Sequence, residues 1–295
     1  RVPGMEISFF GNSLGSWTDE ETLREHRVRP VHLNRLFEPG RGPGPVDYDA
    51  LPTPRFERRE RYVFDILPFR LKHGCPWGRC RFCSLSRGWS SGYRERAADR
   101  VIEELRELSD TYDPRMFICN DNAVSGGNLL DFCRGMADLR KPWGAMARAD
   151  LGREEIAALR RSGCRILYFG LESGSDRVLK RIRKGVTAAQ ISDFVHRVSD
   201  NGIIPAPSLF VGAPGEEERD VEQTIGFLTA HRGCFEMVNV YPLAVTPASD
   251  YSRSREEPDH NTLTRLWRVI AACTELGLKV CVGEECAEYA MGSSA

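Results

Sequence analysis

Three cysteines, Cys75, Cys80 and Cys83, lie close together in the segment HGCPWGRCRFCSL. Three thiolates on one short loop can converge on an iron–sulfur cluster, and three protein ligands leave one iron open for a substrate or cosubstrate. The alternative is a zinc knuckle with His73 as the fourth ligand, although no second Cys-x-x-Cys follows nearby. The ten cysteines of the chain do not have the spacing of a small disulfide scaffold, so the segment predicts a metal or cluster centre.

The overall composition gives no support for a nucleic-acid or membrane partner. The chain has 295 residues, with 41 Lys and Arg against 42 Asp and Glu and a formal net charge of -1. This balance gives no signal for nucleic acid or for an anionic membrane surface. No long apolar run and no secretory leader are visible, so we expect a soluble, cytoplasmic protein with no membrane partner.

The elements that would position the cysteines alternate between apolar strands and amphipathic helices, which is typical of βα units around a mainly parallel sheet. Helices are predicted at 95–112, at 262–276 and after Thr187, which stands in capping-box spacing with Gln190. The strands are predicted at YVFDILPF, RMFICND, WGAMARAD, RILYFGLES, PSLFVGAPG and EMVNVYPLAV. About six units are fewer than the eight of a closed barrel, so we predict a partial, open (β/α)6 TIM-like barrel of the α/β class.

The chain divides into three parts by composition. Residues 1–60 form a proline-rich arm, because segments such as EPGRGPGPVDYDALPTPRFERRE cannot continue a helix or an interior strand. Residues 61–252 form the barrel, and residues 253–295 form a C-terminal helix and a cysteine-containing tail. Because the sequence begins with Arg1 and not with Met, we expect that an upstream region precedes the arm.

With these motifs the sequence resembles the radical S-adenosylmethionine (radical SAM) superfamily from about Tyr62 to Tyr251. The usual family loop has three residues between the first two cysteines, whereas this chain has four, Pro76 to Arg79. It keeps an aromatic residue, Phe82, before the last cysteine. The resemblance implies a [4Fe-4S] cluster on the three cysteines, with SAM bound to the open iron and cleaved reductively to a 5′-deoxyadenosyl radical.

The same resemblance implies three polar contacts to SAM. In CNDN, Asn120 and Asp121 stand where the family contacts the amino group, here without its usual Gly-Gly-Glu; the alternative is a turn of capping residues. Arg148 resembles the arginine that meets the SAM carboxylate with two hydrogen bonds, the alternative being a surface salt bridge. Glu172 directly follows a buried strand, where an acid could bind ribose hydroxyls or an ammonium group.

Two further segments concern adenine and the C-terminus. The backbone at Gly212 and Pro214, in LFVGAPGEEERD, resembles a family segment that approaches adenine closely; an ordinary βα turn is the alternative. No side chain is needed as a nucleophile. Cys281 and Cys286 are the candidates to watch, because a paired tail could close the barrel mouth, donate a hydrogen atom or bind a second metal.

The order of the parts resembles the cobalamin-binding branch of the superfamily, in which methyl transfer, rearrangement and cyclisation occur in natural-product and cofactor metabolism. Cobalamin would be bound by an upstream domain, because no Asp-x-His-x-x-Gly signature is present here. Methylthiotransferases share part of this order but carry further N- and C-terminal domains. The resemblance also implies an external one-electron reductant, flavodoxin- or ferredoxin-like, and a small-molecule or peptide substrate.

Two other interpretations were weighed. The chain could be a non-catalytic iron–sulfur or zinc-binding module with a decayed SAM site, which the altered CNDN stretch and the four-residue cysteine gap would support. A dehydrogenase is not supported, because no G-x-G-x-x-G follows the first strand. A hydrolase is not supported either, because neither G-x-S-x-G match, at 11–15 and at 88–92, directly follows a predicted strand.

Overall fold

The computed structural model describes residues 47–56, 64–83, 93–245 and 249–281. By its internal contacts the chain divides into two units, residues 1–46 and 47–295. Everything described below belongs to the second unit. Most of the predicted proline-rich arm, and Cys286, lie outside the described residues.

A seven-stranded sheet in the order β1-β4-β5-β6-β7-β8-β9 forms the centre of the fold, and every neighbouring pair is parallel. The sheet is open, because no ladder joins β1 to β9 in the part of the chain that is described. A separate antiparallel pair is formed by β2 and β3. The strands are β1 (Ile66–Phe69), β2 (Lys72–His73), β3 (Arg94–Glu95), β4 (Met116–Cys119), β5 (Trp143–Ala147), β6 (Cys164–Glu172), β7 (Ile204–Val211), β8 (Met237–Pro242) and β9 (Lys279–Cys281).

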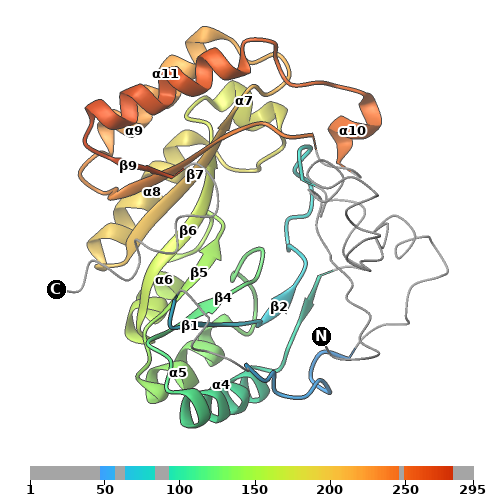
Figure 1. Ribbon diagram of the computed structural model, residues 1–295, viewed down its shortest axis with the longest axis vertical. Coiled ribbons are helices and arrows are strands. Elements are labelled where there is room, and N and C mark those ends of the chain that lie inside the picture. Colours follow the sequence, from blue (N-terminus) through green and yellow to red (C-terminus); the bar gives the residue numbers. More distant parts are fainter. Residues whose placement is uncertain (1–46, 57–63, 84–92, 246–248, 282–295) are drawn as a thin grey trace, which may run out of the picture. The chain divides into compact units, whose positions relative to one another are not determined.

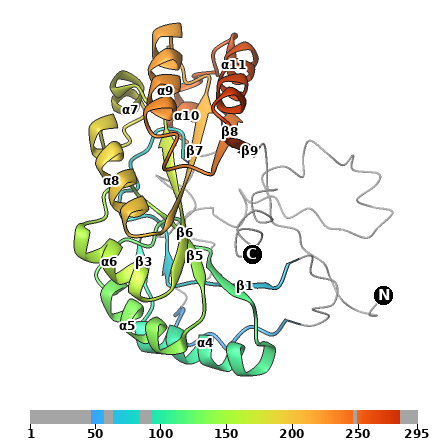
Figure 2. The ribbon, with the colours of Figure 1, turned by 90° about the vertical axis from the view of Figure 1, so that its left-hand side faces the viewer.

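Helices follow most strands and cover one face of the curved sheet (Figures 1 and 2). They are α4 (Ala98–Tyr112), α5 (Leu129–Leu139), α6 (Arg153–Arg161), α7 (Asp176–Arg181), α8 (Ala188–Asp200), α9 (Glu218–Ala230), α10 (Asp250–Ser254) and α11 (Thr262–Glu275). None of the helices in the described ranges is long and apolar enough to cross a membrane. The predicted open α/β barrel is confirmed, with a seventh strand in addition to the six predicted.

The sequence patterns explain most of these elements. Thr187 and Gln190 form the predicted capping box at the start of α8, in which Gln190 N donates to Thr187 Oγ1 at 3.2 Å and Thr187 N donates to Gln190 Oε1 at 2.8 Å. The strand β9 was missed because Lys-Val-Cys is too short to show an alternating pattern. Its pairing to β8 places Cys281 in register with Asn239.

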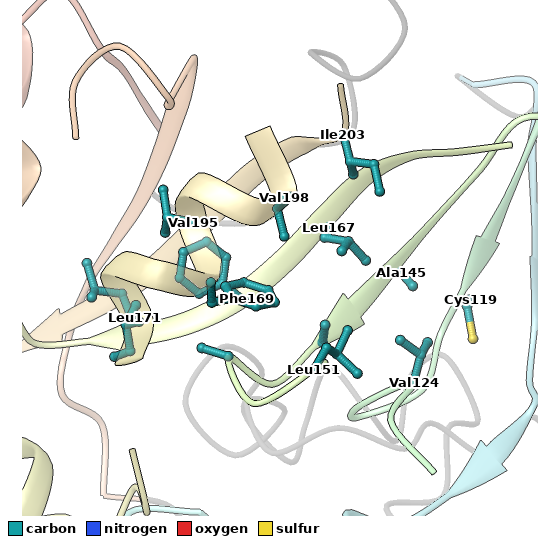
Figure 3. Packing of buried hydrophobic residues seen from close by; sticks show 14 of the residues in the cluster. Cys119, Val124, Ala145, Leu151, Leu167, Phe169, Leu171, Val195, Val198 and Ile203 are labelled. Carbon is teal, nitrogen blue, oxygen red and sulfur yellow. The ribbon is translucent and has the colours of Figure 1, made fainter. Parts of the chain in front are cut away.

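The main hydrophobic core lies between the sheet and the helices. Figure 3 shows Leu167, Phe169 and Leu171 of β6 beside Val195 and Val198 of α8. Successive strand residues point to opposite faces of a sheet, so the intervening positions of β6 face the concave side. A smaller cluster of buried residues occupies that side, formed by Met116, Ile166, Ala206 and Met237. In barrels of this kind, functional residues lie at the C-terminal ends of the strands.

Candidate active site

The loop with the three cysteines follows the short strand β2 and is fixed to distant parts of the barrel. Arg81 N donates to the carbonyl of Ile182, just after α7, at 3.0 Å. The ring of Phe82 packs edge-on against Phe210 of β7, with 4.9 Å between ring centroids. The loop therefore spans from the first strand of the sheet to the ends of β6 and β7, which lie at the C-terminal edge of the barrel.

Helix α10, which the sequence analysis missed, supports the same loop from the other side. Tyr251 N donates to the carbonyl of Arg81 at 3.3 Å, and the Arg81 guanidinium lies 4.8 Å from the centroid of the Tyr251 ring. Arg81 also pairs with Glu256. The loop is therefore bonded to the fold on both sides, through Ile182 and through Tyr251.

The three thiols have different environments. Cys80 is buried, whereas Cys75 and Cys83 are partly exposed, and no described cysteine is in a disulfide. Burial raises the pKa of the Cys80 thiol to about 11, and the positive charges of Lys184 and Arg148 oppose that rise. Both basic residues are therefore near enough to act on a thiolate at Cys80.

Three thiols on one loop have the donor chemistry of an iron–sulfur cluster that keeps one iron open. Among the described residues, no group of three His, Cys, Asp or Glu side chains is close enough to hold one metal ion. His73, the fourth ligand of the zinc alternative, stacks instead on Tyr48 with 5.1 Å between ring centroids. A cubane cluster binds its thiolates at separate corners and spaces them more widely than one ion does, and three thiols leave one corner open.

Glu172 ends β6 in a strained conformation. Its φ is 61°, a left-handed value that costs a residue with a side chain about 1–2 kcal/mol, and the β6–β7 register shifts beside it. Its Oε1 accepts a hydrogen bond from Lys184 Nζ at 2.6 Å, and both side chains are buried. A Cβ on Gly170 would overlap both groups, so the glycine makes room for the pair. Strained backbone of this kind clusters at functional sites.

Lys184 was not identified by the sequence analysis, because RIRKG has the pattern of an exposed basic helix end. It is 6% exposed, and its carbonyl accepts a hydrogen bond from Arg148 Nη2 at 3.0 Å. Arg148 Nε donates to Asp150 Oδ2 at 2.7 Å. Arg148 is thus buried at the end of β5, and its Nε and Nη2 both donate to protein acceptors.

In the CNDN stretch, the two residues predicted to contact the amino group of SAM differ in burial. Asn120 is exposed, whereas Asp121 is buried, and Asp121 Oδ2 accepts from Leu71 N at 3.2 Å. Burial raises the pKa of Asp121 to about 6. The Asp121 carboxyl also interacts with the Cys119 thiol, and its buried Oδ1 has no hydrogen-bond partner among the described residues. Asp121 therefore positions the chain after β1 and retains an acceptor.

The segment after β7 forms a turn supported by its own acid. Gly212 has a φ of 92°, and its N–H donates to Glu216 Oε2 at 2.6 Å. A Cβ at Gly212 would overlap the Thr262 side chain, so a glycine is required here. Pro214 is buried in the same turn. These contacts account for an ordinary βα turn and leave the approach to adenine as a prediction.

Glu216 gives this turn a pH dependence. Burial raises the pKa of Glu216 to about 7, so the folded chain retains a proton that the unfolded chain releases at lower pH. Stability should therefore fall as the pH rises from the ordinary glutamate pKa to about 7. Glu216→Gln keeps an acceptor for Gly212, and its stability should not fall over this pH range. At alkaline pH its free energy of unfolding should exceed that of the parent by up to about 3 kcal/mol.

Thermal unfolding of the parent and of Glu216→Gln at about pH 5 and about pH 8 measures this difference. Glu154→Gln is the matched control, because Glu154 is exposed on α6. Equal pH trends for the parent and Glu216→Gln would show that the raised pKa of Glu216 is not the cause of the pH dependence.

Cys281 lies on β9 and is partly exposed. It packs against the small hydrophobic cluster on the concave side of the sheet. Cys286, its predicted partner, is outside the described ranges. The pairing of the two cysteines therefore stays a prediction.

Sequence comparisons relate this chain to known proteins. A family model described as the radical SAM superfamily matches residues 70–228. An uncharacterized methyltransferase of Pyrococcus horikoshii is 32% identical over 189 residues, covering 61% of this chain and 41% of the relative. The bacteriochlorophyllide d C-12(1)-methyltransferase of Chlorobaculum tepidum is 26% identical, covering 78% and 51%. The chain spans about half the length of these relatives, or less.

Solved structures show the same fold at low sequence identity. The methyltransferase TsrM from Kitasatospora setae, with cobalamin and a [4Fe-4S] cluster bound, superposes with a TM-score of 0.56 at 18% identity, covering 63% of this chain and 35% of that one. The coproporphyrinogen III oxidase HemN of Escherichia coli superposes with a TM-score of 0.57 at 15% identity, covering 72% and 53%. Both likenesses support the partial barrel.

Proposed function

Because this chain belongs to the radical SAM superfamily, whose members are enzymes that use SAM and an iron–sulfur cluster, we propose that it is a radical SAM methyltransferase. Cys75, Cys80 and Cys83 would bind the [4Fe-4S] cluster. When bound, the cluster and SAM would supply the reductive cleavage that yields a 5′-deoxyadenosyl radical. The observation that carries the proposal is the meeting of the cysteine loop with Arg148, Glu172 and Lys184 at the C-terminal edge of the sheet.

The charges at this edge match the charges of SAM. The carboxylate of SAM needs cationic donors, and Arg148 and Lys184 provide them. The ammonium group and the ribose hydroxyls need acceptors, and Glu172 and Asp121 provide them. Adenine would lie along the turn at Gly212 and Pro214, and Phe82 would shield the cluster side of the site.

Methyl transfer is supported by the described functions of similar proteins. Two of the curated relatives are described as methyltransferases, and one solved neighbour is a methyltransferase with cobalamin bound. We propose that cobalamin is bound outside the described residues and that an external one-electron reductant, flavodoxin- or ferredoxin-like, reduces the cluster. The substrate would approach from the concave side of the sheet and be a small molecule or a peptide.

Methyl transfer from SAM leaves S-adenosylhomocysteine, which can be separated from 5′-deoxyadenosine by chromatography. The test uses the natural full-length protein, reconstituted with SAM, a reductant and hydroxocobalamin under anaerobic conditions. Cobalamin-dependent S-adenosylhomocysteine would support the methyltransferase assignment. Formation of 5′-deoxyadenosine alone, with or without cobalamin, would assign the chain to another radical reaction.

The alternative is a non-catalytic iron–sulfur module with a decayed SAM site. It predicts a reconstituted cluster whose spectrum does not change when SAM is added. The buried, strained Glu172 argues against decay, because a decayed site has no reason to retain a costly conformation.

A further inference from the structure

Trp77 lies in the four-residue gap between Cys75 and Cys80 and anchors the cysteine loop to the turn after α7. Its indole Nε1 donates to the carbonyl of Arg183 at 2.8 Å. The ring lies directly on Gly185, whose φ is 78° and where a Cβ would overlap the indole. The indole is therefore fixed both by a hydrogen bond and by a contact that only glycine permits.

The Trp77 ring also makes a cation–π contact. The Arg148 guanidinium lies 5.0 Å from the centroid of the Trp77 ring. Such a contact stabilises a guanidinium, more so when it is shielded from water, and Arg148 is only 6% exposed. Arg79 lies 5.2 Å from the ring centroid, so the indole is a shared surface for two cations.

Trp77 and Arg148 also bind the same short backbone segment. The carbonyl of Arg183 accepts from Trp77, and the next carbonyl, that of Lys184, accepts from Arg148. The side chain of Lys184 in turn binds Glu172. A shift of the indole would therefore change the positions of Arg148 and Lys184, because all three are bonded to the backbone of residues 183 and 184 or belong to it.

We propose that Trp77 is a positioning residue that holds Arg148 and the 183–185 segment in place to receive the carboxylate of SAM. This inference rests on the function proposed above. The four-residue gap between Cys75 and Cys80 contains this tryptophan. The gap thus links the metal-binding loop to the SAM-binding cations, and affinity for SAM depends on the indole.

The test measures SAM binding, not turnover. Trp77→Leu and Trp77→Phe are reconstituted anaerobically, and equilibrium dialysis with labelled SAM gives the dissociation constant. Trp77→Leu should weaken SAM binding by about tenfold with the cluster absorbance retained, whereas Trp77→Phe keeps an aromatic face and should recover most of the affinity. Trp267→Leu is the control, because Trp267 is 67% exposed on α11.

Gly185→Ala is the second variant, because its Cβ would displace the indole and strain the 183–185 segment while the sequence of the cysteine loop stays unchanged. It should weaken SAM binding to a similar extent, which keeps the inference testable if Trp77→Leu does not fold. Unchanged SAM affinity in a Trp77→Leu or Gly185→Ala protein with a full cluster would overturn the inference alone. A parent protein that holds a cluster and binds no SAM would overturn the proposed function itself.

Discussion

Lys184→Met should destabilise the fold by about 3–5 kcal/mol and weaken SAM binding by about tenfold to a hundredfold. The first effect follows because the substitution leaves the buried carboxylate of Glu172 without its cation. The second follows because the variant would lack the charge-assisted contact that Lys184 makes to the SAM carboxylate in the proposed function. Chemical denaturation and equilibrium dialysis measure the two effects separately.

A double-mutant cycle separates stability from binding. Glu172→Gln with Lys184→Met removes both charges, and it should be more stable than Lys184→Met alone because no unpaired buried charge remains. Its SAM affinity should stay low, because neither functional group is restored. Lys180→Met on α7 is the matched control, because Lys180 is exposed. Recovery of SAM affinity in the double variant would show that the pair is purely structural.

Cys80→Ala should abolish cluster uptake and lower 5′-deoxyadenosine formation by at least about a hundredfold. A cluster that keeps two of its three thiolates is not held stably. Cys80 is the most informative of the three ligands, because it is buried near Lys184 and Arg148 and cannot be replaced easily by water. Iron and sulfide analysis with visible absorbance reads out the cluster directly.

Cys273→Ala is the matched control for this loss. Cys273 is also buried, but it lies on α11 and not in the cysteine loop. It should keep normal iron content at a small cost in stability. Equal iron content in Cys80→Ala and the parent would show that the cluster ligands were misassigned.

The barrel could be predicted from the sequence because its signals are local. Alternating strand and helix patterns, and the Thr187–Gln190 cap, need only neighbouring residues. The short strand β9 and the short helix α10 were missed, because three and five residues carry too little periodicity. Their positions are set by pairing with β8 and by packing on Arg81, which are contacts between distant parts of the chain.

The candidate site was predicted in part for the same reason. Cysteine spacing is local, so the loop could be recognised, whereas Lys184 acquires its role only where the turn after α7 meets Glu172. Glu216 was missed because its partner is the backbone N–H of Gly212 in a turn. The distinction between Asn120 and Asp121 depends on which side chain faces Leu71, which one sequence does not show.

The most direct test of the account is the formation of 5′-deoxyadenosine by the anaerobically reconstituted chain with SAM and a reductant. The account predicts product from the parent, none from Cys80→Ala and near-parental product from Cys273→Ala. A parent that binds a full [4Fe-4S] cluster and SAM, is reduced, and still leaves SAM intact would contradict the radical mechanism.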